Sequence, residues 1–246
     1  MAYLVYGVTK DPAVVGESMT GMKGRAVSFV AGHGLCAAVS ELDVEEGAPP
    51  VSQLLDYSRV VEALHSRQAF IPMRYGCFLN GIQAIRDVLK ARQRQYETLL
   101  AELAGHVEMG IRILLPEKEC ENISPERTTL PEAEPSINGR AYLALRKVHY
   151  RMQEETSQGR QALIDRFIQA FSGLYARHRT ETDAKKDAVI LSLYFLTPES
   201  AVNRFRQIFE DVREKENDDA ILSGPWPPYN FVTTDIAPAN DSSFRT

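Results

Sequence analysis

The stretch Ala69–Phe78, with the sequence Ala-Phe-Ile-Pro-Met-Arg-Tyr-Gly-Cys-Phe, decides how the first half of the chain folds. It is short, apolar and aromatic, and helix-like segments precede and follow it, so we predict a strand. Pro72 has no backbone N–H to donate to a ladder, which places it at a strand start or edge. Gly76 indicates a bulge or a close approach of another backbone. Arg74 places a charge in this otherwise apolar run.

The composition is that of an ordinary globular protein with one large or two small domains. Of the 246 residues, 44% are hydrophobic and 25% are charged, as in typical domains. The net charge of −5 does not favour a nucleic-acid partner. No run approaches the roughly 18–20 apolar residues of a membrane span, and the N-terminus reads as a strand without a targeting signal. We therefore expect a cytosolic protein whose partners include neither nucleic acid nor a lipid membrane.

The rest of the first half completes an α+β domain. We predict strands where β-branched and aromatic residues cluster, and helices where apolar residues recur with a period near 3.6. The further predicted strands are Tyr3–Thr9, Val27–Val30, Leu35–Leu42 and Val107–Leu115, and the predicted helices span residues 52–68 and 80–105. This order favours an antiparallel sheet with helices on one face, a variant of the ferredoxin-like fold.

A run rich in glutamate and proline, residues 117–138, marks the expected domain boundary. Its composition is typical of a solvated linker, so we assign residues 1–116 to an N-terminal α+β domain. After it, a long helical region, a strand at Ala188–Leu196, a helix and a last strand predict a helix-rich α+β domain over residues 139–232. This domain closes with a proline- and aromatic-rich segment, and residues 233–246 form a polar tail.

No motif of the sequence assembles a catalytic or metal site. Neither Gly-x-Gly-x-x-Gly nor Gly-x-x-x-x-Gly-Lys occurs, which leaves a nucleotide role unsupported. The five histidines lack metal-ligand spacing, and His65 suits a hydrogen bond at a helix C-terminus better than catalysis. The cysteines are far apart and odd in number, which is typical of buried or inert thiols; they are Cys36, Cys77 and Cys120. We expect no enzyme, no cofactor and no metal.

Arg74 is the residue of the opening stretch that needs a partner. A charge within a central strand must be paired with an opposite charge. Glu108, on the last strand of the same half, or Glu62, on the preceding helix, could supply it. We expect a structural ion pair of Arg74 with Glu108. The alternative is an anion site, which would belong to a small-ligand-binding protein or an enzyme with its site between the two domains.

The closing segment Gly224–Val232, Gly-Pro-Trp-Pro-Pro-Tyr-Asn-Phe-Val, contains the single tryptophan of the chain. Its prolines and aromatic rings form a rigid apolar surface, which can dock within the chain or receive a partner protein. The sequence leaves both alternatives open. If a partner binds here, we expect Trp226, Tyr229 and Phe231 to contact it.

Five short motifs follow one another along nearly the whole chain, apart from the acidic linker and the tail. They are Tyr3–Thr9 with Gly34–Ser40; His65 with the Pro-Met-Arg-Tyr-Gly run Pro72–Gly76; Val107–Arg112; Gly139–Leu143; and Gly224–Phe231. Each motif alone is weak, but in this order they resemble the GvpF/GvpL family of gas vesicle proteins, most closely its cyanobacterial-type GvpF members.

The resemblance implies a role in making gas vesicles, the hollow protein shells that give cells buoyancy. Proteins of this family are regarded as minor vesicle components or assembly factors. They are thought to contact the small hydrophobic shell protein GvpA and to limit its aggregation during nucleation. The resemblance therefore implies a non-enzymatic protein of the gas vesicle inside the cell, with GvpA and other gas vesicle proteins as partners. The resemblance implies no catalytic residues, and it does not indicate which surface contacts GvpA. A sheet edge or the closing segment could form that contact.

Overall fold

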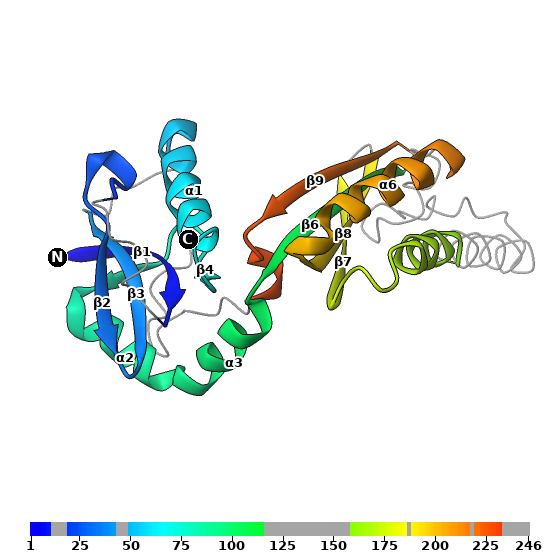
Figure 1. The fold of residues 1–246 in the computed structure, drawn as a ribbon. Coiled ribbons are helices and arrows are strands. Elements are labelled where there is room, and N and C mark those ends of the chain that lie inside the picture. Colours follow the sequence, from blue (N-terminus) through cyan, green and yellow to red (C-terminus); the bar gives the residue numbers. More distant parts are fainter. Residues whose placement is uncertain (11–18, 43–48, 116–157, 186–187, 217–218, 233–246) are drawn as a thin grey trace, which may run out of the picture. The chain divides into compact units, whose positions relative to one another are not determined.

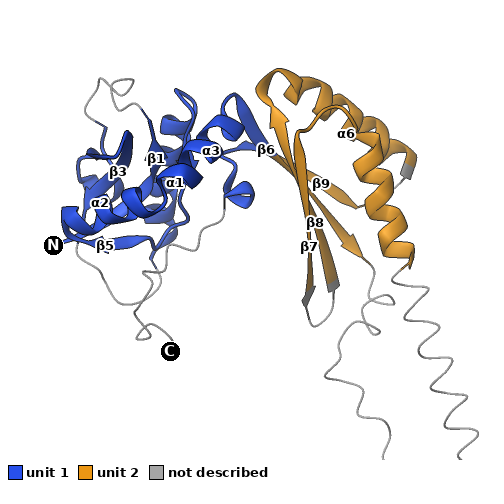
Figure 2. Ribbon diagram, turned by 90° about the horizontal axis from the view of Figure 1, so that it is seen from below, with its two compact units in different colours: residues 1–108, 225–246 blue, residues 109–224 orange. Residues whose placement is uncertain are grey.

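The computed structural model contains two compact units (Figure 2). Unit 1 comprises residues 1–108 and 225–246, and unit 2 comprises residues 109–224. The chain therefore leaves unit 1 once and returns to it near its C-terminal end. The structure describes residues 1–10, 19–42, 49–115, 158–185, 188–216 and 219–232.

Several of the predicted segments lie outside these residues. They are the acidic linker at 117–138, the first part of the long helical region, the polar tail at 233–246, and Cys120. Within the described residues, no helix is long and apolar enough to cross a membrane.

Unit 1 is built on a five-stranded sheet in the order β2-β3-β1-β4, with β5 also paired to β1 (Figure 1). The pairs β1–β3, β1–β4, β1–β5 and β2–β3 are all antiparallel. The strands are β1 (Ala2–Thr9), β2 (Ser28–Gly32), β3 (Leu35–Glu41), β4 (Ile71–Pro72) and β5 (Phe78–Asn80). The helices are α1 (Val51–His65), α2 (Gly81–Ala91) and α3 (Gln93–Leu103), with 3-10 turns at Met22–Gly24 and Tyr229–Phe231.

Helices cover both faces of this sheet. Residues Leu4–Thr9 of β1 are buried in succession, which requires cover on both sides because successive strand residues point to opposite faces. On one face Tyr6 shares a core cluster with Tyr57 of α1. On the other face a Cβ at Gly32 would meet the side chain of Leu89 in α2 at 3.6 Å. We expected helices on one face; the unbroken apolar run in β1 is the sequence signal of two-sided burial.

The opening stretch forms two short strands with a bulge between them, so the prediction of one strand is wrong. Both strands pair with the same edge of β1. The N–H of Met73 donates to the carbonyl of Tyr6, and the N–H of Val5 donates to the carbonyl of Cys77, each at 2.9 Å. Val5 and Tyr6 are consecutive in β1, so the residues between Met73 and Cys77 have no place in the ladder and bulge out of it. Gly76 has a φ of +100°, which glycine adopts without steric cost.

The hydroxyl of Tyr57 fills the gap that the bulge opens. Its oxygen lies 3.1 Å from the carbonyl oxygen of Val5 and 2.8 Å from that of Met73, and its single O–H donates to one of them at a time. The ring stacks on Tyr6 with centroids 5.1 Å apart and meets Tyr75 edge-on at 5.5 Å. Burial raises the pKa of Tyr57 well above its usual value, as expected for a hydroxyl that must stay protonated to donate.

Unit 2 contains a four-stranded sheet in the order β7-β8-β6-β9. Its described elements are, along the chain, β6 (His106–Leu115), a helix at 158–170, β7 (Arg177–Lys185), β8 (Ala188–Pro198), a 3-10 turn at Glu199–Ala201, α6 (Val202–Glu216) and β9 (Ala220–Trp226). This is the β-α-β-β-α-β order of the ferredoxin-like motif.

The two helices described in unit 2 share one core with its sheet. Alternate residues of β8, such as Leu191 and Leu193, are fully buried against Phe167 of the first helix and Phe205 of α6. Phe171 stacks on Phe205 with ring centroids 4.1 Å apart. The alternation leaves the other residues of β8 on the opposite face of the sheet.

The α+β class, with antiparallel strands, is confirmed, but the ferredoxin-like order occurs in unit 2 rather than in the first half. The reason is β6, which we counted as the last strand of the N-terminal domain and which pairs instead with β8 and β9. The compact units also group residues 225–232 with the N-terminal part of the chain, whereas we expected them to close the C-terminal domain. The domain bounds 1–116 and 139–232 stay predictions.

Tyr57→Phe should lower the free energy of unfolding by about 1–3 kcal/mol, because the buried carbonyls at the bulge lose their donor. The pKa of Tyr57 is raised in the folded state and near 10 in the unfolded state. Its contribution is therefore complete below about pH 10 and lost as the pH rises further. Urea unfolding from neutral to alkaline pH should show a steeper alkaline loss for the wild type than for Tyr57→Phe. Tyr3→Phe, a half-exposed tyrosine of β1, is the matched control, and equal slopes would contradict this account.

Candidate functional site

The closing segment packs within unit 1. Pro227 and Pro228 are buried, and so are Phe231 and Val232. Tyr229 packs against the core cluster that joins β1 and α1. Of the two alternatives that the sequence left open for this segment, docking within the chain is therefore what the structure shows.

Asn230 links the segment to two charged residues far away in the sequence. The carboxylate of Glu108, which is 5% exposed, accepts from the backbone N–H of Asn230 at 2.8 Å and from its Nδ2 at 2.7 Å. The Nη2 of Arg74 donates to the Oδ1 of Asn230 at 2.9 Å. The structure thus brings Arg74 and Glu108 together through the amide of Asn230.

The surroundings of Arg74 differ from those expected. The residue lies on the bulge after β4 and is exposed, rather than inside a central strand, so its charge stays hydrated. The direct ion pair of Arg74 with Glu108 stays a prediction, and the contact shown here is the bridge through Asn230. An anion site at Arg74 gains no support from this hydrogen bond.

The negative charge near the closing segment also affects Tyr229. Burial first, and then the charges of Glu62 and Glu108, raise the pKa of its hydroxyl. Tyr229 is therefore a neutral, half-buried ring at every physiological pH.

The residues expected to contact a partner differ in their accessibility. Trp226, the last residue of β9, is 46% exposed, while Phe231 is buried and Tyr229 is half-buried. A partner can therefore reach the ring of Trp226 directly, but it could reach Phe231 only if the segment detached.

The other candidate groups do not converge on a reaction centre. His65 is the last residue of α1 and is half-buried. Cys36 of β3 is buried, and Cys77 is half-buried. Across the described residues, no three His, Cys, Asp or Glu side chains are grouped closely enough to hold a metal ion. A hollow of about 610 Å³ lies on the unit 2 sheet; it is lined by Arg112, Glu181, Thr182, Asp183, Ile190, Ser192 and Tyr194.

An apolar patch on α1, which the sequence reasoning missed, lies on the solvent side of the helix. Val51 and Leu55 are 71% and 53% exposed, and Leu54 is exposed as well. The buried face of the helix is formed instead by Tyr57, Val60, Val61 and Leu64. The spacing of three and four residues places Val51, Leu54 and Leu55 side by side, so we call them the α1 patch.

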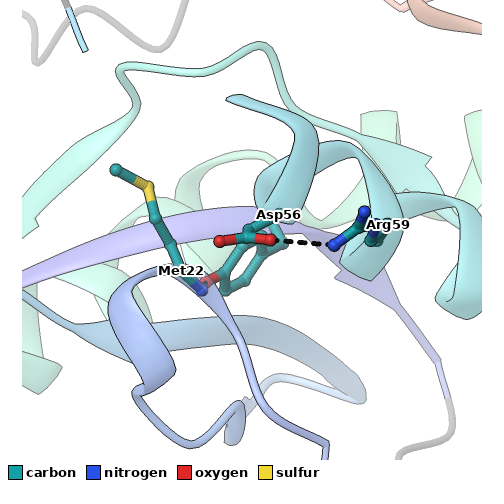
Figure 3. A network of polar contacts seen from close by, with 4 residues as sticks. Met22, Asp56 and Arg59 are labelled. Atoms are coloured by element: carbon teal, nitrogen blue, oxygen red, sulfur yellow. Dashed lines mark hydrogen bonds and ion pairs between the residues drawn. The ribbon is translucent and has the colours of Figure 1, made fainter. Parts of the chain in front are cut away.

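A charged pair borders the α1 patch. Nη1 of Arg59 lies 3.1 Å from Oδ1 of Asp56, one turn back on the helix. Figure 3 shows this pair together with Met22, whose backbone N–H donates to the hydroxyl of Tyr6 at 2.9 Å. The pair is exposed, so it adds little stability and leaves the patch with one polar border.

The protein is therefore an α+β protein of two units, each built on an antiparallel sheet, with the closing segment docked within the first unit. The exposed apolar face of α1 is a surface suited to contact other proteins. The chain belongs to the gas vesicle synthesis protein GvpL/GvpF family, whose model matches residues 2–233. The resemblance found in the sequence motifs is thereby confirmed.

Relatives of known name agree with this assignment. Gas vesicle protein F2 of Halobacterium salinarum is 21% identical, over 94% of this chain and 92% of its own length. Gas vesicle protein L2 of the same organism is 25% identical, over 94% and 90%. The crystal structures of gas vesicle protein GvpF from Microcystis aeruginosa and from Anabaena match with TM-scores of 0.73 and 0.71, at 16% and 17% identity, over 94% of this chain and 98% of theirs. At such identities the structures support the fold.

Glu108→Gln should lower the free energy of unfolding by about 2 kcal/mol, because a neutral amide replaces a charged acceptor and turns a donor toward Asn230. Trp226 is the single tryptophan and lies close to Asn230 in the sequence, so its fluorescence can be used to follow unfolding. Glu41→Gln, at an exposed strand end, is the control. A double-mutant cycle with Asn230→Ala should show that the two effects are not additive; additive effects would mean that the hydrogen bonds do not couple them.

Cys77 should be slow to alkylate at neutral pH. Burial raises its pKa to about 11, and the thiolate is the reactive form. In a Cys36→Ala/Cys120→Ser protein, the rate of reaction with iodoacetamide should keep rising with pH to about 11, whereas an unperturbed thiol levels off near 8.5. The same protein in denaturant is the control, and a plateau near 8.5 in the folded protein would show that the thiol is not buried.

Proposed function

We propose that this chain is a non-enzymatic assembly factor or minor component of gas vesicles, which binds the hydrophobic shell protein GvpA in the cytoplasm and limits its aggregation while a vesicle forms. Membership of the family supports the gas vesicle role. The α1 patch supports the contact with a hydrophobic partner, and it is the observation that carries the proposal.

The physical need for such a contact follows from the shell itself. A subunit that keeps water out of a gas space has a large apolar surface, and such a surface aggregates unless another protein covers it. Each large aliphatic side chain of the α1 patch contributes about 1.5–3 kcal/mol when a partner buries it fully. Because the three side chains are adjacent, they form a continuous contact, unlike apolar residues scattered singly over a surface.

Trp226 is the second contact that we propose. Aromatic side chains are common anchors in protein interfaces, and this ring is accessible while the segment that carries it is held by Asn230. Tyr229 and Phe231, which we expected to share the contact, then act as the support of the segment and not as its contact surface.

The contact can be tested by capture of GvpA. Val51→Ser/Leu55→Ser should weaken capture at least about tenfold, since it removes two buried aliphatic side chains from the interface, and it should let GvpA scatter light at lower concentration. Trp226→Ala should have a smaller effect in the same assay. Leu114→Ser/Ile221→Ser removes residues of the same kind and of similar exposure, 52% and 68%, from unit 2 and is the matched control.

The outcomes separate the surfaces. Wild-type capture by both the α1 variant and Trp226→Ala would refute the assignment of either surface to GvpA. Loss of capture in the unit 2 control alone would move the contact to the sheet of that unit.

A further inference from the structure

β7 forms one edge of the unit 2 sheet (Figure 1). Its residues Arg177–Asp183, with the sequence Arg-His-Arg-Thr-Glu-Thr-Asp, are all exposed. Because side chains alternate along a strand, Arg177, Arg179, Glu181 and Asp183 share one face. Two positive charges are therefore followed by two negative charges along one exposed row.

The pairing of β7 with β8 does not account for this pattern. The β8 residues directly opposite the four charges are uncharged. They are Leu196, Tyr194, Ser192 and Ile190. Glu181 and Asp183 share a hollow with Arg112 of β6, and the outer edge of β7 is the side on which a further strand would lie.

The charges of β7 complement those of a second β7 that runs antiparallel to it. If the two strands are centred on Thr180, Arg177 of each copy faces Asp183 of the other. In the same register Arg179 of each copy faces Glu181 of the other. Opposite charges placed directly across two antiparallel strands stabilise the pair, and like charges destabilise it.

The sequence selects this register among the symmetric ones. A centre at Arg179 or at Glu181 places that residue against its own copy, so that like charges meet. A centre at His178 places Arg177 against Arg179, and a centre at Thr182 places Glu181 against Asp183. Thr180 is the centre within this row at which each charge faces an opposite charge.

The backbone permits the same arrangement. In an antiparallel pair, alternate residues direct both N–H and C=O toward the neighbouring strand. In a register centred on one residue, the sequence numbers of two opposed residues differ by an even number. A residue whose N–H and C=O point outward in one copy therefore meets a residue whose N–H and C=O point outward in the other. The N–H and C=O groups on the outer side of β7 would then be satisfied by a strand of identical sequence.

We propose that two copies of this chain associate through β7, antiparallel about Thr180, and join their unit 2 sheets into one continuous sheet. A second copy fits better than an unrelated strand, because the charge row is complementary to itself in this one register. The proposal concerns the protein alone and does not depend on its contact with GvpA.

Two charge-reversed variants test the register. Arg177→Glu/Arg179→Glu makes the row wholly acidic, and Glu181→Arg/Asp183→Arg makes it wholly basic. Each variant alone faces like charges across the strands, so its dimer dissociation constant should rise at least about tenfold above that of the wild type. An equimolar mixture of the two variants should form a mixed dimer, and the quadruple variant should dimerise again.

Sedimentation at low salt, where charge effects are strongest, measures these states on the full chain. Arg204→Glu/Arg213→Glu changes the net charge equally on α6, where both residues are exposed, and should leave the dimer unchanged. Circular dichroism and thermal melting confirm that each variant is folded.

Several results would overturn the proposal. A wild-type protein that stays monomeric up to its solubility limit would do so, as would a dimer indifferent to charge reversal or acidic and basic variants that do not combine. If the wild type is monomeric and the β7 variants lose GvpA, the edge binds another chain and the symmetric dimer is excluded.

Discussion

The hydrogen bonds between Glu108 and Asn230 join residues that are 122 positions apart. Closing a flexible loop of that length costs about 4 kcal/mol, and two hydrogen bonds to a charged acceptor return about 1.5–3 kcal/mol each. Since much of the intervening chain folds as unit 2, the loop that must close is shorter in effect. These hydrogen bonds, together with the buried side chain of Phe231, hold the closing segment in unit 1.

An amide suits the position between Glu108 and Arg74 better than a direct ion pair would. Glu108 is buried, whereas Arg74 is exposed on the bulge, and drawing the guanidinium inward would remove its hydration at a cost of several kcal/mol. Asn230 has donors for the carboxylate and an acceptor for the guanidinium, so it satisfies both without moving either charge. The bulge that exposes Arg74 is in turn stabilised by the hydroxyl of Tyr57, which contacts the carbonyls of Val5 and Met73.

The sequence predicted the elements of this fold more reliably than their partners. The strands at Tyr3–Thr9 and Ala188–Leu196 were found because their apolar residues are local signals, and the order of the motifs was enough to indicate the family. The place of β6 could not be read from its own residues, because a strand carries no local mark of the sheet in which it pairs. Likewise the role of Asn230 depends on contacts 122 and 156 positions away, which no spacing in the sequence reveals.

A protein that holds an aggregation-prone subunit must itself avoid aggregating. Exposed sheet edges are the usual route to unwanted pairing, and charged side chains along an edge oppose it. Over Arg177–Asp183 of β7, two positive charges are followed by two negative charges, and in the register centred on Thr180 each of them faces an opposite charge. The same residues that deter a hydrophobic strand would thus admit a second copy of this chain. The α1 patch would then be the surface that remains free for a hydrophobic partner, and it lies in the other compact unit.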